Sequence, residues 1–257
     1  MTYAREDRSF GGVTKPVLRM GDSGPAVIVI HEVYGFTPPT ERLCGWIADA
    51  GFRVYAPILL GSPDTTNVEK ITAGLILRLC VSREFTLFRT GRSSPVVDWL
   101  KPLARAAHAE CGGAGVGVIG MCLSGGFGLS MAVDPVVMAP VLSQPSMPPV
   151  DKAGLDISSA DLDTVRRRCE NDGLRVLGYR FAGDTLSRAD RFETLDRELG
   201  DAFVPTTLPD SAGNSAGMKS EGKPPHSVLT RDLIDAAGEP TRAAVDEIIG
   251  FMRERLG

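Results

Sequence analysis

The sequence predicts an α/β fold in which a mostly parallel, doubly wound sheet is flanked by helices. Continuous apolar runs at 26–30 and 116–120 are typical of strands that are covered on both faces. Segments with helical spacing separate such runs along the chain, as a parallel sheet requires. The chain has 257 residues, of which 43% are hydrophobic, so it can bury one large core. We expect a single domain over residues 1–257, with insertions or loops at 143–173 and 209–225 that shape a pocket.

The first half of the chain contains the clearest strand signals. Gly51 ends a predicted helix, and Pro57 ends the strand that follows it. A later helix begins at Ser94, whose hydroxyl can cap it and which is followed by a proline in the first turn. Residues 58–93 are the hardest to interpret. We predict strands at 26–30, 52–56 and 116–120 and helices at 40–50, 67–81 and 94–108.

The second half continues the alternation of strands and helices. A small-residue helix follows the third strand directly, and the last helix is apolar along one face. We predict strands at 136–142, 174–181 and 203–208 and helices at 124–133, 159–171, 191–199 and 240–256.

Composition excludes several classes of partner. The net charge of -4 leaves no basic field for nucleic acid or for an anionic membrane surface. The charged N-terminus lacks the apolar run of a signal peptide, and no apolar stretch is long enough to span a membrane, so we expect a cytoplasmic location. The five cysteines are odd in number and widely spaced, which indicates free thiols.

Ligands of such sheets bind beyond the carboxyl ends of the strands. The residues that follow the predicted strands are therefore the first candidates for a site. This rule selects Glu32, Cys122, Asp184 and the loop before His226.

The most informative segment is Gly120-Met121-Cys122-Leu123-Ser124-Gly125-Gly126. It joins a buried strand to a helix through small residues, which is where α/β-hydrolases place a nucleophile on a sharp turn. The backbone N–H groups at a helix start favour a thiolate, and the N–H of Leu123 is placed to donate to an oxyanion. The alternative is a buried structural cysteine on a glycine-rich turn.

A nucleophile in this fold needs a later histidine and an acid between the two. Of the three histidines, His31 precedes Cys122 and His108 lies on the polar side of a helix, which leaves His226. For the acid, Asp184 follows an apolar strand in a Gly-Asp turn and is preferred over three other aspartates. Those are Asp172, before the strand, Asp190, at a helix start, and Asp210, after the next strand.

Two motifs resemble cofactor or metal sites without meeting their requirements. The G-x-G-x-x-G at 115–120 lies inside a strand, whereas a dinucleotide site needs it after the strand. The His-Glu pair at 31–32 lacks the second histidine of a zinc-protease helix. We therefore expect no cofactor and no metal.

With these residues, the chain resembles the dienelactone hydrolase family of α/β-hydrolases. The resemblance rests on the cysteine turn at 120–126, on His31-Glu32-Val33-Tyr34-Gly35, on Gly183-Asp184 and on Pro225-His226-Ser227, and it extends from about Ala26 to the C-terminus.

The resemblance implies a Cys-His-Asp triad that hydrolyses a small ester or lactone through an acyl-thiol intermediate. Cys122 would be the nucleophile, His226 the base and Asp184 its orienting acid. Glu32 would contact the resting cysteine and help to convert it to thiolate when substrate binds. The N–H groups of Val33 and Leu123 would form the oxyanion hole.

Two features depart from the family pattern. Ser124 stands where the family has glycine, and the arginines that bind a substrate carboxylate have no clear counterparts. Arg83 is the nearest candidate by position, and Tyr34 is a second candidate for substrate binding.

The leading hypothesis is therefore a carboxylic-ester hydrolase, either a monomer or a small homo-oligomer. A catalytically silent hydrolase-fold protein that binds a small ligand or a partner is the alternative from another class. A redox role for Cys122 is disfavoured because no resolving cysteine is near in sequence.

Overall fold

A computed structural model describes residues 3–61, 93–147, 151–216 and 222–257. Its strands form a single sheet of eight in the order β1-β2-β4-β3-β5-β6-β7-β8. The strands are β1 (Ala4–Phe10), β2 (Val13–Met20), β3 (Ala26–Ile30), β4 (Arg53–Pro57), β5 (Val116–Met121), β6 (Val137–Ser143), β7 (Val176–Phe181) and β8 (Phe203–Leu208).

The pairing confirms the prediction of a mostly parallel sheet. From β4 to β8 all neighbours are parallel, with Ile28 opposite Val118 and Val141 opposite Leu177. Only β2 runs antiparallel to its neighbours β1 and β4. The parallel strands therefore bring their carboxyl ends to one edge, where the candidate residues gather.

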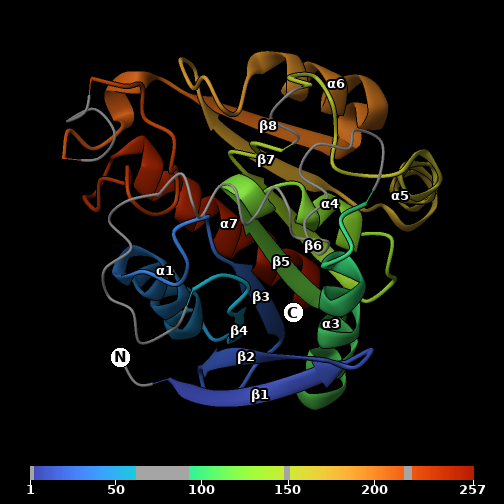
Figure 1. Cartoon of the computed structure of the whole chain (residues 1–257). Coiled ribbons are helices and arrows are strands. Elements are labelled where there is room, and N and C mark those ends of the chain that lie inside the picture. Colours follow the sequence, from blue (N-terminus) through green and yellow to red (C-terminus); the bar gives the residue numbers. More distant parts are fainter. Residues whose placement is uncertain (1–2, 62–92, 148–150, 217–221) are drawn as a thin grey trace.

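Helices cover both faces of the sheet (Figure 1). Side chains of α1 and α7 pack in the core on one face, and those of α3, α4, α5 and α6 pack in the core on the other. The helices are α1 (Pro38–Asp49), α3 (Val97–Cys111), α4 (Phe127–Met131), α5 (Ser159–Asp172), α6 (Ala189–Leu199) and α7 (Pro240–Leu256), with 3-10 turns at Cys122–Ser124, Gly200–Ala202 and Asp210–Ala212.

The N-terminal hairpin is the main element absent from the sequence prediction. β1 is charged and mostly exposed, so its sequence lacks the apolar run that is typical of a buried strand. It lies at the edge of the sheet, where no other strand of the described residues pairs with its outer side (Figure 1). Charged side chains are typical of such edge strands.

The largest differences from the predicted helices are at α3 and at the turn before α4. α3 begins at Val97, three residues after the predicted start at Ser94. The carbonyl of Ser94 accepts from the N–H of Val97 in a turn that precedes the helix. The helix predicted at 124–133 is divided into the 3-10 turn and the short α4. The helix predicted at 67–81 lies outside the described residues.

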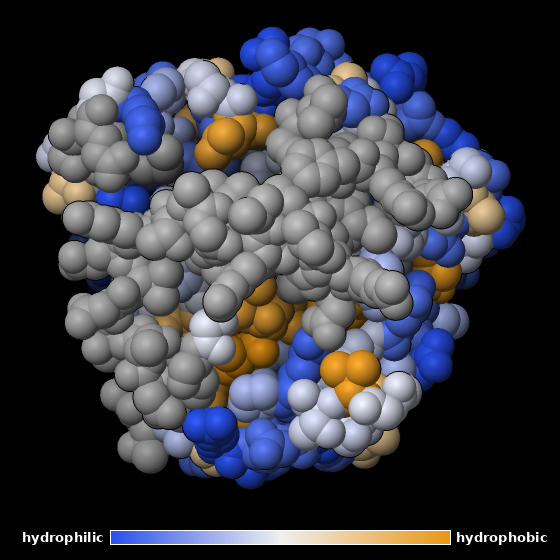
Figure 2. Space-filling view, viewed as in Figure 1, coloured by the Kyte–Doolittle hydropathy of each residue, from blue (hydrophilic) through white to orange (hydrophobic). Residues whose placement is uncertain are grey.

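Hydrophilic residues line much of the outline of the face in Figure 2, and a group of hydrophobic residues is visible in its lower half. Among the described residues, no helix combines the length and the apolar character needed to cross a membrane.

Candidate active site

Cys122 lies on the sharp turn that joins β5 to the following helix. Its backbone φ of 56° is in the left-handed region, which non-glycine residues rarely adopt. The side chain is 6% exposed. Such strain at a buried cysteine occurs where the surrounding structure forces it, and functional sites are the usual place.

The residues around Cys122 are small because other backbone segments pass close by. A methyl group on Gly120 would collide with the carbonyl of Ser124, and one on Gly125 would meet Cα of Pro145 at 2.5 Å. Ser124, which departs from the family glycine, ties the turn together. Its hydroxyl accepts from the N–H of Met121 at 3.0 Å and lies 3.0 Å from the carbonyl of Ile30. The hydroxyl of Ser124 therefore connects the turn to the end of β3 by a hydrogen bond.

His226 is buried on the loop that follows β8 and is held there by Asp232. One carboxylate oxygen of Asp232 accepts from the backbone N–H groups of His226 and Ser227, at 2.9 and 2.8 Å. The side chain of Asp232 is fully buried, and His226 is 3% exposed. The contact fixes the backbone from which the imidazole projects.

Asp184 follows β7 and meets His226, although the two are far apart in sequence. Its Oδ2 lies 2.7 Å from Nδ1 of His226, and its Oδ1 accepts from the N–H groups of Leu186 and Ser187. The same loop is held from below by Arg180, which donates to the carbonyl of Ser187. A carboxylate fixed in this way holds the ring in the tautomer that carries its proton on Nδ1.

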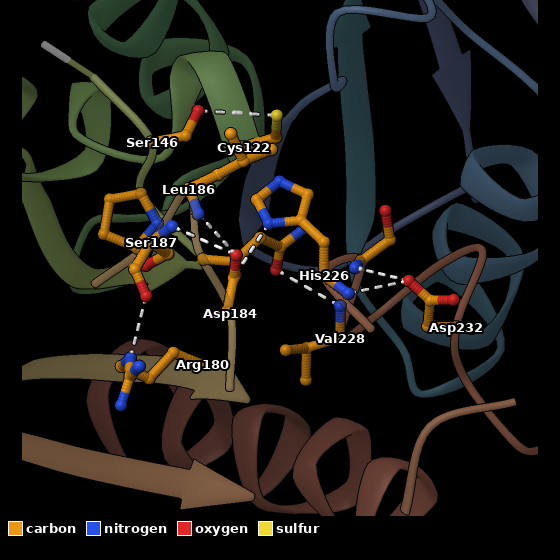
Figure 3. Close-up of polar contacts among 12 residues, drawn as sticks. Cys122, Ser146, Arg180, Asp184, Leu186, Ser187, His226, Val228 and Asp232 are labelled. Carbon is orange, nitrogen blue, oxygen red and sulfur yellow. Dashed lines mark hydrogen bonds and ion pairs between the residues drawn. The ribbon is translucent and has the colours of Figure 1, made fainter. Parts of the chain in front are cut away.

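The other ring nitrogen of His226 is turned toward Cys122 (Figure 3). Nε2 is buried and has no hydrogen-bond partner among the described residues. Burial lowers the pKa of His226, but its interactions with Cys122 and with the Asp184 carboxylate outweigh the burial and raise the pKa well above 6.5. The sulfur is thus near enough to interact with the ring.

Ser146 provides a second polar contact to the sulfur. Its Oγ lies 3.5 Å from Cys122 Sγ, and its N–H donates to the carbonyl of Cys122 at 3.0 Å (Figure 3). A hydroxyl in this position can donate to a thiolate.

The backbone N–H groups of Leu123 and Val33 donate no hydrogen bond to another described residue. Leu123 directly follows Cys122, and Val33 packs against the hydrophobic cluster that contains Cys122. Two unpaired donors of this kind suit a developing oxyanion.

Glu32 is buried at the end of β3, but its hydrogen bonds do not go to Cys122. Its two oxygens accept from Gln144 Nε2 at 2.8 Å and from the Thr230 hydroxyl at 2.9 Å. The structure thus brings Glu32 to the same strand edge as Cys122, with different partners from those that the resemblance implied.

His31 has a structural environment. Its Nε2 accepts from the N–H of Leu59 at 3.0 Å and its Nδ1 lies 2.7 Å from the carbonyl of Glu32. Burial lowers the pKa of His31 to about 4. The ring is therefore neutral at physiological pH and joins the ends of β3 and β4.

Arg231 places a positive charge beside Tyr34 and was not among the predicted site residues. Its guanidinium lies 3.3 Å from the Tyr34 hydroxyl and 5.6 Å from the centre of the Tyr34 ring. Tyr34 in turn is within electrostatic reach of Glu32 and Cys122. The other predicted substrate residue, Arg83, lies outside the described residues.

The strand-end rule could have identified Gln144 and Ser146, because they directly follow β6. Asp232 and Thr230 had no comparable signal. Their roles depend on how the loop after His226 folds back, and spacing alone does not show that.

The sequence between residues 15 and 160, more than half of the chain, matches the model of the dienelactone hydrolase family. No curated protein matches the chain.

Solved structures share the fold at low identity. A dienelactone hydrolase-like promiscuous phosphotriesterase from metagenomic libraries is 20% identical with a TM-score of 0.65, over 100% of this chain and 99% of that one. A dienelactone hydrolase from Anabaena variabilis is 15% identical with a TM-score of 0.60, over 100% and 99%. A cold-adapted esterase from an Arctic intertidal metagenomic library is 16% identical with a TM-score of 0.60, over 100% of both chains.

The family match, the sheet order and the strand-to-helix turn agree with one another. The chain therefore belongs to the dienelactone hydrolase family and is a carboxylic-ester hydrolase with the α/β-hydrolase fold.

Proposed function

We propose that this hydrolase cleaves a small carboxylic ester or lactone with Cys122 as nucleophile, His226 as base and Asp184 as orienting acid. One observation carries the proposal. The His226 ring is held by Asp184 at 2.7 Å on one side and turns its other nitrogen toward a cysteine whose backbone φ is 56°.

The first half of the reaction forms an acyl-thiol. The Cys122 thiolate attacks the carbonyl carbon of the substrate, and the carbonyl oxygen becomes an oxyanion that accepts from the N–H groups of Leu123 and Val33. When this intermediate collapses, the bond to the leaving oxygen breaks and the His226 imidazolium gives that oxygen its proton. In a lactone the leaving oxygen stays attached to the acyl group.

The second half releases the acid. His226, now neutral, removes a proton from water as that water attacks the acyl-thiol carbon. The carbon–sulfur bond then breaks, so the thiolate and the imidazolium are both restored. Asp184 keeps Nε2 directed at the reacting atoms throughout, because Nδ1 is engaged.

The substrate we infer carries a negative charge. Arg231 lies against Tyr34, and Tyr34 is within electrostatic reach of Glu32 and Cys122. A guanidinium beside such a site favours a carboxylate on the substrate. Both Arg231 and His226 belong to the loop after β8, so one loop would supply the base and the charge that orients the ester.

The test is a burst experiment on an activated aryl ester. We expect the wild type to release about one equivalent of phenol per site before steady turnover, since an activated ester should acylate Cys122 faster than water hydrolyses the acyl-thiol. Cys122→Ala should abolish both the burst and the turnover. Cys169→Ala, which removes a half-buried thiol on α5, is the matched control and should keep both.

A burst that survives in Cys122→Ala would refute the proposed nucleophile. A wild type without turnover above the Cys122→Ala background would instead indicate a catalytically silent protein that binds a small ligand or a partner. The single domain, the cytoplasmic location and the monomeric or small homo-oligomeric state stay predictions.

A further inference from the structure

Three buried polar side chains meet beside the candidate triad. Glu32 follows β3, Gln144 follows β6 and Thr230 lies four residues after His226; their exposures are 3%, 0% and 1%. We call them the Glu32 cluster. Gln144 donates to one oxygen of Glu32 at 2.8 Å, and Thr230 donates to the other at 2.9 Å.

Gln144 extends the cluster to a second point on the same loop. Its Oε1 accepts from the N–H of Val228 at 3.3 Å and from the hydroxyl of Ser143. Its φ of 34° is one of two positive values among the described non-glycine residues, the other being that of Cys122. A strained, fully buried glutamine persists only where its contacts over-determine it.

The Glu32 cluster therefore attaches the His226 loop to the sheet at residues 228 and 230. Both attachments depend on Glu32, one directly through Thr230 and one through the orientation that it imposes on Gln144. Each carboxylate oxygen already has a partner, and neither partner is the sulfur of Cys122. Among the described residues, the hydroxyl of Ser146 lies 3.5 Å from that sulfur, and the ring of His226 is turned toward it (Figure 3).

We infer that Glu32 is a positioning residue that holds the His226 loop through Thr230 and Gln144 and does not exchange a proton with Cys122. The inference rests on the proposed function, since it assigns Glu32 a place in the machinery that presents His226. It differs from the role that the family resemblance implied, in which this carboxylate acts on the cysteine itself.

The decisive comparison is Glu32→Gln against Glu32→Ala. A glutamine at 32 can accept from Gln144 through its oxygen and donate to the Thr230 hydroxyl through its amide, because a hydroxyl can also accept. We therefore expect kcat on an aryl ester to stay within about threefold of wild type in Glu32→Gln. In Glu32→Ala the loop loses both attachments, and kcat should fall at least about thirtyfold with a smaller change in KM.

Equal loss of kcat in Glu32→Gln and Glu32→Ala would overturn the inference, because a role that needs the charge or the proton of the carboxylate is lost in both. The alkylation rate of Cys122 against pH is the second readout. Its profile should be unchanged in Glu32→Gln, and a profile shifted as far as in Glu32→Ala would also overturn the inference.

Thr230→Ser and Thr230→Val give an independent pair in case Glu32→Ala fails to fold. Serine keeps the hydroxyl, so its kcat should match wild type, while the isosteric valine should lower kcat several-fold. Equal kcat in the two variants would contradict the positioning role.

Hydrogen exchange separates this inference from the proposed function. The amides of residues 226–230 should exchange faster in Glu32→Ala than in wild type and should be unchanged in Glu32→Gln, whether or not Cys122 is the nucleophile. The burst in wild type and Cys122→Ala reports on the nucleophile alone.

Discussion

Two buried histidines in this protein have opposite environments. His31, at the end of β3, and His226, after β8, are each 3% exposed. The polar partners of His31 are backbone groups, and burial lowers its pKa to about 4. His226 meets Cys122 and the Asp184 carboxylate, which raise its pKa despite the burial. Burial alone therefore does not decide whether a histidine is structural; the charges around it do.

Glutamine substitutions at the two histidines should give the largest difference in activity. His226→Gln removes the proposed base and should lower kcat/KM on an aryl ester by about 10²–10⁴-fold. His31→Gln disturbs the hydrogen bond from Leu59 and should lower the free energy of unfolding by about 1–3 kcal/mol, with less than a tenfold loss of kcat/KM. Steady-state kinetics and urea unfolding measure both. If the two variants lost the same activity, the two histidines could not be separated into a structural and a catalytic one.

The pH dependence of the free energy of unfolding gives a second test of the environment of His31. The pKa of His31 is about 4 in the folded chain and 6.5 when unperturbed, so the unfolded state binds its proton more readily. The contribution of the neutral His31 ring to the free energy of unfolding is fully present above pH 6.5. It is lost as the pH falls toward 4, at about 1.4 kcal/mol per pH unit. Urea unfolding of wild type and His31→Gln should therefore show a stability difference that shrinks on acidification. A difference that stays constant from pH 7 to pH 4.5 would contradict the low pKa.

The smallest expected effect concerns Ser146, the second polar neighbour of the sulfur. Ser146→Ala removes a donor to the thiolate and should slow alkylation of Cys122 at neutral pH by about three- to tenfold. Ser158→Ala is the matched control, because its hydroxyl caps α5 and its loss should cost about 1 kcal/mol of stability without a change in alkylation. Alkylation that proceeds equally fast in wild type and Ser146→Ala would show that the contact has no effect on the thiolate.

The accuracy of the sequence prediction followed the strength of the local signal. The apolar run at 26–30 predicts β3 with its observed bounds, since a strand that is buried on both faces must be apolar throughout. The charged β1 was missed because it lies at the sheet edge and needs no apolar residues. The start of α3 was placed three residues early, because Ser94 and Pro95 form a turn that resembles a helix cap.

The sequence by itself determined the α/β class, the cysteine turn at 120–126 and the chain order of Cys122, Asp184 and His226. These features depend on local periodicity, on small residues at a sharp turn and on order along the chain, all of which can be read from sequence. Only the tertiary structure showed that Asp232 anchors the His226 loop and that Glu32 pairs with Gln144 and Thr230. Such contacts join residues up to 198 positions apart, so they follow from how strand ends and loops meet in space and leave no pattern in the sequence.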